Sequence, residues 1–105
     1  MELKGVLIDT GTTYTVLPED ILGEVGAWGP MPGVEVELGN GEKVRAKAYG
    51  VAIKIEGVEA PSISITFKGA KTVIGVETLE SIGLKLDPTM GNLEFTRPKG
   101  MAYFY

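Results

Sequence analysis

The stretch GVLIDTGTT (residues 5–13) decides the fold, because an apolar segment runs directly into a short polar turn. Residues 3–8 are mostly apolar, which predicts an interior β-strand. The turn that follows can hold the carboxylate of Asp9 in a fixed, partly desolvated position. The chain has no histidine and no cysteine, so a Ser-His or Cys-His nucleophilic site is excluded. Carboxylates remain as the obvious acid–base groups, and Asp9 is the first candidate.

Length and composition indicate one globular domain over residues 1–105. Such a chain buries roughly 60–70% of its unfolded surface, which is too little for two lobes with a cleft between them. The composition, 44% apolar and 23% charged, is that of a folded protein. No apolar run approaches the ~20 residues of a membrane span. The net charge of −4 argues against nucleic-acid binding. Because cysteine and an apolar leader are both absent, we expect a cytoplasmic protein.

A short helix is predicted after the first turn. Pro18 and the two acidic residues that follow it suit the start of a helix, and Gly26 suits its end. Residues 27–33 contain one tryptophan and two prolines, and they are predicted to form an ordered loop.

A β-hairpin is predicted over residues 34–48. Polar and apolar side chains alternate on both sides of Gly39-Asn40-Gly41, and an Asn-Gly pair between alternating runs is a strong hairpin signal. Residues 49–51 shift the phase of the alternation, which predicts a bend or bulge.

The second half of the chain predicts further short elements. Residues 62–67 alternate between hydroxyl and apolar side chains, as a strand does. Residues 72–75 predict a short buried strand, and residues 76–82 a helix that Gly83 ends. The apolar residues at 84–86 and 93–95 are predicted to pair across a turn. The chain is therefore mainly β, with one or two short helices.

Three features together resemble the retropepsin-like aspartic proteases, the single-domain retroviral type that works as a homodimer. VLIDTGT (residues 6–12) is similar to the apolar strand and Asp-Thr/Ser-Gly motif of that family. VIGVETLESIGLKL (residues 73–86) resembles the second hallmark, an Ile-Gly pair followed by a short helix and another Ile-Gly. The glycine-tipped hairpin lies between them, where the family carries its flap. The resemblance covers roughly residues 6–95.

The resemblance implies a closed β-barrel domain in which two chains place their Asp9 carboxylates together on a two-fold axis. Two like charges this close hold one proton between them. The ionised carboxylate accepts a proton from a water that attacks a peptide carbonyl, and the protonated one donates to the carbonyl oxygen. The implied activity is that of an aspartic endopeptidase on peptides or proteins, with an acidic optimum and no metal or organic cofactor.

The same resemblance assigns roles around the carboxylate. Thr10 is implied to bond across the dimer, and Gly11 to let the backbone approach its symmetry mate. Thr12 is a candidate to hydrogen-bond the outer oxygen of Asp9.

Two further segments complete the implied site. The hairpin tip, Gly39-Asn40-Gly41, is expected to close over a substrate held as an extended strand. Ile74 and Gly75 are expected to pack beneath or beside the Asp9 loop, with Ile74 a candidate to line a subsite.

The chain departs from the family pattern at both ends. The family has an additional strand or hairpin before the catalytic strand, whereas eight residues precede Asp9 here. Residues 96–105 extend past the point where many family members end. Three alternatives stay open for this tail: it replaces the missing part of the dimer interface, it occupies the cleft, or it is a disordered end.

Two other functions compete with the enzyme. Residues 8–14 resemble the first phosphate loop of the actin and sugar-kinase superfamily, but that fold needs two large lobes that 105 residues cannot hold. The more serious alternative is a retropepsin-like domain that no longer cleaves and acts as a dimeric peptide-binding or structural module. The intact residues Asp9, Thr10 and Gly11 argue for the enzyme.

Overall fold

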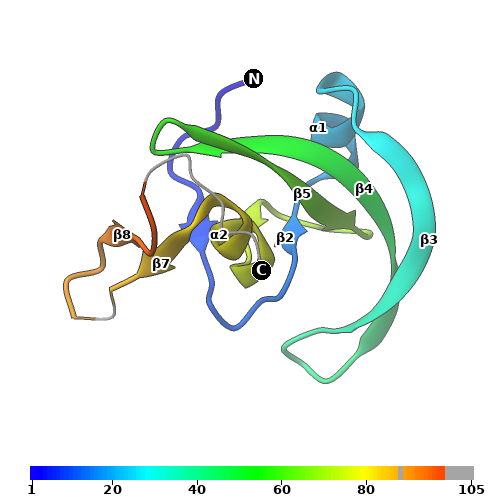
Figure 1. Cartoon of the computed structure of the whole chain (residues 1–105). Coiled ribbons are helices and arrows are strands. Elements are labelled where there is room, and N and C mark those ends of the chain that lie inside the picture. Colours follow the sequence, from blue (N-terminus) through cyan, green and yellow to red (C-terminus); the bar gives the residue numbers. More distant parts are fainter. Residues whose placement is uncertain (88, 99–105) are drawn as a thin grey trace, which may run out of the picture.

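A computed structural model describes residues 1–87 and 89–98 as a mainly β fold with two short helices (Figure 1). The mainly β prediction is therefore confirmed. The tail assigned to an interface or to the cleft lies largely at residues 99–105, outside the described residues. In chain order the elements are β1 (Leu7–Ile8), β2 (Thr15–Val16), α1 (Glu19–Glu24), β3 (Trp28–Glu37), β4 (Lys43–Ile55), β5 (Val58–Thr66), β6 (Val73–Ile74), α2 (Val76–Ile82), β7 (Leu84–Leu86) and β8 (Leu93–Phe95).

Six strands form one mixed sheet in the order β1-β6-β2-β5-β4-β3, and β7 and β8 form a separate pair. β1 pairs with β6 in parallel, which places the two hallmark stretches, residues 6–12 and 73–86, side by side. Within the described residues β1 and β3 are free edges, so strand pairing does not close the sheet into a barrel. Figure 1 shows β3 and β4 as a long curved arm whose tip lies at the same end of the molecule as the loop between β1 and β2.

Two apolar clusters hold these elements together. One lies between α2 and β5, and its buried members are Val58, Ala60, Leu79, Ile82 and Leu84. The other lies under the β3–β4 hairpin, and its buried members are Val16, Ala46, Ala48 and Ile65. The sheet is therefore held by two separate apolar clusters, one against α2 and one at the β3–β4 hairpin.

Both predicted helices are present and end at glycine. α1 is followed by Gly26 at φ +70°, and α2 by Gly83 at φ +89°, the left-handed conformation that glycine adopts without strain. Neither of the helices that the structure describes is long and apolar enough to cross a membrane. The predicted pairing of residues 84–86 with 93–95 is also confirmed.

The expectation of an interior strand over residues 3–8 is wrong. Only Leu7 and Ile8 form β1, and the strand lies at a sheet edge with Leu7 64% exposed. Gly5 has φ +65°, which turns the chain just before the strand and limits its length. The first motif therefore sits at an open edge of the sheet.

The expected loop over residues 27–33 is also wrong, because β3 already begins at Trp28. Pro30 and Pro32 lack an N–H donor, but β3 is an edge strand and its register with β4 shifts on both sides of Met31. The bend expected at residues 49–51 is absent from the pairing of β4 with β5, which runs in continuous register. The pairing of β4 with β3 does shift register at residues 48–50, opposite Trp28 to Met31, and the extra residue lies on β3.

Candidate active site

The turn after β1 holds Asp9 at the edge of the sheet. Its N–H donates to the Ile74 carbonyl at 3.0 Å, and its own carbonyl accepts from the Thr12 N–H at 3.0 Å. The Gly11 N–H donates to Asp9 Oδ1 at 2.9 Å. No other group of the described chain bonds this carboxylate, and the side chain is exposed. The turn thus orients the carboxylate and leaves one oxygen available.

The residues after Asp9 shape the turn through their backbone. A Cβ at Gly11 would lie 3.2 Å from Asp9 Oδ1, so glycine leaves room for the N–H to approach. The expected hydrogen bond from the Thr12 hydroxyl to Asp9 is not formed among the described residues; the Gly11 N–H is the group that bonds the carboxylate. Thr10 is exposed, and its hydroxyl has no hydrogen-bond partner within residues 1–87 and 89–98.

The second hallmark stretch packs directly against this turn. Val76 N–H donates to the Thr12 carbonyl and Glu77 N–H to the Thr13 carbonyl, each at 2.8 Å. A Cβ at Gly75 would lie 2.5 Å from the carbonyl carbon of Tyr14, which is closer than real Cβ contacts come. Gly75 therefore lies against the Asp9 loop, as the sequence predicts.

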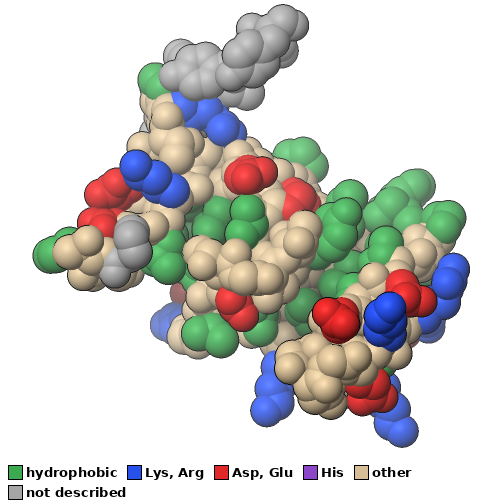
Figure 2. Space-filling view, turned by 90° about the horizontal axis from the view of Figure 1, so that it is seen from below, with side chains coloured by type: hydrophobic (Ala, Val, Ile, Leu, Met, Phe, Trp, Pro, Cys, Tyr) green, Lys and Arg blue, Asp and Glu red, His purple; other side chains and the backbone are tan. Residues whose placement is uncertain are grey.

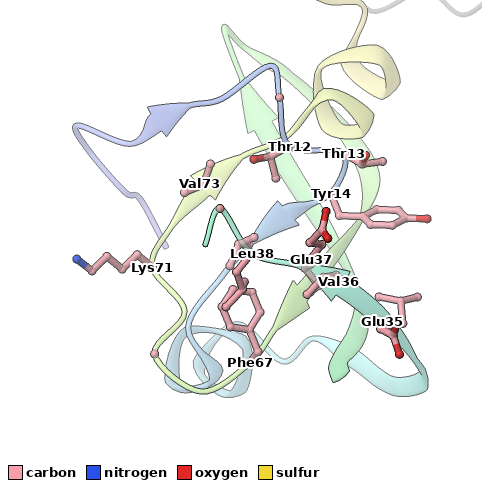
Figure 3. Close-up of a pocket in the computed structure, with 16 residues that line it drawn as sticks. Thr12, Thr13, Tyr14, Glu35, Val36, Glu37, Leu38, Phe67, Lys71 and Val73 are labelled. Atoms are coloured by element: carbon pink, nitrogen blue, oxygen red, sulfur yellow. The ribbon is translucent and has the colours of Figure 1, made fainter. Parts of the chain in front are cut away.

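A pocket of about 540 Å³ lies between this loop and the β3–β4 hairpin (Figure 3). Figure 3 shows Leu38 and Phe67 close together on one side, while the Lys71 side chain extends away. Seen from below in Figure 2, hydrophobic side chains gather between the hairpin tip, which is ringed by charged side chains, and the rest of the domain. The apolar lining residues are Tyr14, Val16, Val34, Val36, Leu38, Ile65, Phe67 and Val73.

The hairpin tip is a tight turn in which Gly41 adopts a left-handed backbone conformation. Gly41 N–H donates to the Leu38 carbonyl at 2.9 Å, and Glu42 N–H donates to Asn40 Oδ1 at 2.9 Å. Gly41 has φ +83°, whereas Gly39 has no positive φ. Gly39 borders the pocket but Asn40 and Gly41 do not, so only part of the predicted tip reaches it.

Replacing Gly41 by alanine is expected to destabilise the hairpin by about 1 kcal/mol, because an L-residue is disfavoured in the left-handed region. Gly39→Ala is a matched control, since a Cβ at either glycine meets nothing within 4 Å and only the backbone conformation differs. Urea unfolding should show a lower midpoint for Gly41→Ala and an unchanged one for Gly39→Ala. Equal midpoints for the two variants would contradict this turn.

Two further residues line a second groove rather than this pocket. Ile74 does not border the pocket beside the Asp9 loop; it lines a groove of about 1270 Å³. Its carbonyl accepts the Asp9 N–H. Trp28, which lines the same groove, is 72% exposed.

Sequence reasoning missed the wall of the pocket and the polar groups beneath the loop. Val34 and Val36 were identifiable as strand residues, but only the fold brings them opposite the loop. The hydroxyl residues at 62, 64 and 66 recur on one strand face, but the sequence alone does not show that this face is the buried one.

The comparisons with known proteins add no family to this picture. No model of a known protein family matches the chain, and a search of the curated proteins finds no match.

Proposed function

We propose that the chain is an aspartic endopeptidase whose active site forms when two copies pair and each contributes one Asp9. The observation that carries the proposal is the Asp9 loop itself. It holds an exposed carboxylate by one N–H and borders a pocket that a hairpin faces. A single carboxylate is half of an acid–base pair, and the sheet edge on which it lies leaves space for the other half.

The chemistry follows from the paired carboxylates. Two Asp9 side chains within hydrogen-bonding reach share one proton, so one acts as base and the other as acid. The base accepts a proton from water as the water attacks the amide carbonyl. The acid donates to the carbonyl oxygen as the tetrahedral intermediate forms. The free Thr10 hydroxyl, which has no partner among the described residues, is available to bond the other copy.

The pocket supports a peptide as the substrate. Its lining includes eight apolar side chains, and it opens beside the loop that carries Asp9. β3 is an edge strand, so the hairpin can offer unpaired backbone groups to an extended peptide. In this proposal the β3–β4 hairpin of each copy serves as a flap over the shared site.

A mixing experiment tests whether the site is shared between chains. Wild type and Asp9→Asn would be refolded together in equal amounts and assayed on an unstructured protein such as casein. If only dimers of two wild-type chains cleave, activity falls to about one quarter of that of unmixed wild type at equal total protein. Random pairing of equal amounts makes about one quarter of all dimers of this kind. A fall to about one half would mean that each chain carries its own site and would contradict the proposal. Peptide binding without any cleavage by wild type would instead support the binding module.

A further inference from the structure

Three hydroxyl side chains form a continuous line of hydrogen bonds beneath the Asp9 loop. Thr15 Oγ1 bonds Thr78 Oγ1, and Thr78 Oγ1 lies 2.7 Å from Ser62 Oγ. At one end of the line, the Gly75 N–H donates to Thr15 Oγ1 at 3.0 Å. At the other end, the Ser62 hydroxyl donates to Glu77 Oε1 at 3.2 Å. All three hydroxyl residues are buried, and none borders the pocket beside Asp9.

The two ends fix the direction of every bond in the line. A hydroxyl has one proton to donate, and an ionised carboxylate only accepts. Because Ser62 donates to Glu77, it must accept from Thr78, and Thr78 must then accept from Thr15. The Thr15 hydroxyl thus donates its proton to Thr78, and its oxygen accepts the Gly75 N–H. The reverse direction would bring two donors to Thr15 and leave its own proton without an acceptor.

Glu77 is also fixed to three different parts of the fold. Its Oε1 accepts from the Ile63 N–H of β5 at 2.8 Å, and its Oε2 accepts from Ser81 of α2 at 2.8 Å. Its own N–H donates to the Thr13 carbonyl, in the segment that leads out of the Asp9 turn. The carboxylate therefore ties residues 75–77 to β5 on one side, while the backbone of the same residues holds the Asp9 loop on the other.

We propose that Glu77 is a positioning residue for Asp9, acting through this directed line of hydroxyls and through residues 75–77. This positioning role deepens the proposed peptidase function and rests on it. Glu77 touches neither the pocket nor the reacting carboxylate. Its loss is therefore expected to move the Asp9 loop while the opposite wall of the pocket, which Val34 and Val36 of β3 form, stays in place.

The strand β5 offers a matched pair of variants. Ser62 and Ser64 lie two residues apart on one buried face, but Ser64 Oγ has no hydrogen-bond partner within the described chain. Ser62→Ala breaks the line, and Ser64→Ala removes an unpartnered hydroxyl. Glu77→Met removes the acceptor, whereas Glu77→Gln keeps an acceptor oxygen and supplies a donor for Ser81.

Steady-state kinetics on a peptide substrate tests the proposal. Ser62→Ala and Glu77→Met are expected to lower kcat on the order of tenfold to a hundredfold with KM within about twofold, because a small displacement of a reacting group has effects of that size. Ser64→Ala and Glu77→Gln are expected to keep kcat within about threefold. Equal loss in Ser62→Ala and Ser64→Ala, failure of Glu77→Gln to restore kcat, or a rise in KM alone would overturn it.

A second readout separates this proposal from the enzyme assignment. The NMR shift of the Gly11 amide reports on its bond to Asp9 Oδ1, whether or not the protein cleaves peptides. Glu77→Met and Ser62→Ala should move this signal, and Ser64→Ala should leave it in place. If wild type hydrolyses nothing while the shifts follow this pattern, the peptidase proposal fails and the positioning of the loop stands. An unmoved Gly11 signal in folded Glu77→Met overturns the positioning role.

Discussion

Asp9→Asn is expected to abolish peptide hydrolysis, with kcat lowered by roughly 10³-fold or more, the scale on which a general acid–base group acts. The asparagine can neither accept the proton of the attacking water nor share a proton with its twin. Its side-chain oxygen can still accept from the Gly11 N–H, so the turn should survive. Cleavage kinetics and sedimentation of the same sample measure the two properties separately.

Asp87→Asn is the matched control for this variant. Asp87 Oδ1 accepts from an N–H two residues ahead, Thr89, at 2.9 Å, just as Asp9 accepts from Gly11. Both substitutions therefore remove one charge from the same kind of turn. Full activity of Asp87→Asn beside an inactive Asp9→Asn assigns the chemistry to Asp9. Turnover by Asp9→Asn at the wild-type rate would remove Asp9 from the mechanism.

Gly75→Ala is expected to lower the free energy of unfolding by roughly 3 kcal/mol, the upper end of the usual range for overpacking. The added Cβ would lie 2.5 Å and 2.6 Å from the carbonyl carbon and oxygen of Tyr14, and 2.8 Å from the Thr13 carbonyl oxygen. These are backbone atoms of the segment that follows Asp9, and they cannot rotate away as a flexible side chain can. Relief of the clash must separate the loop from α2.

Gly23→Ala is the control for the loss of glycine itself. Gly23 lies within α1, and a Cβ there meets nothing within 4 Å. Alanine is the better helix former by up to about 1 kcal/mol, so this variant should be slightly stabilised. Thermal or urea unfolding of both proteins tests the contrast. A Gly75→Ala midpoint equal to that of wild type would show that Gly75, at the start of α2, does not pack against the segment after Asp9 as described.

The sequence predicts correctly the elements that are specified by glycine-containing turns and caps and by the spacing of apolar residues. The helix over residues 76–82 was predictable because its apolar spacing and its terminal Gly83 are local signals. The hairpin was predictable from Gly39-Asn40-Gly41 for the same reason. The length of β1 was not, because a strand's extent depends on which partner lies beside it, and β6 offers it only two residues.

The burial of β5 shows why the polar part of the site escaped prediction. Alternation over residues 62–67 identified a strand but not which face is buried. The structure buries the hydroxyl face, with Ser64 0% exposed, and leaves Ile63 38% exposed. Ser62 is tolerated there because Thr78 and Glu77 come from α2 to bond it, whereas the Ser64 hydroxyl has no partner within the described chain. Such pairing depends on the tertiary fold, and no local pattern encodes it.

The separation of the two Asp9 carboxylates in a crystal of the dimer tests whether they form one shared site. We expect an oxygen of one carboxylate to lie about 3 Å from an oxygen of the other, close enough to share a proton. The two Thr10 side chains should lie beside them at the same axis. A dimer joined through another surface, with these carboxylates on opposite sides of the assembly, would contradict the account.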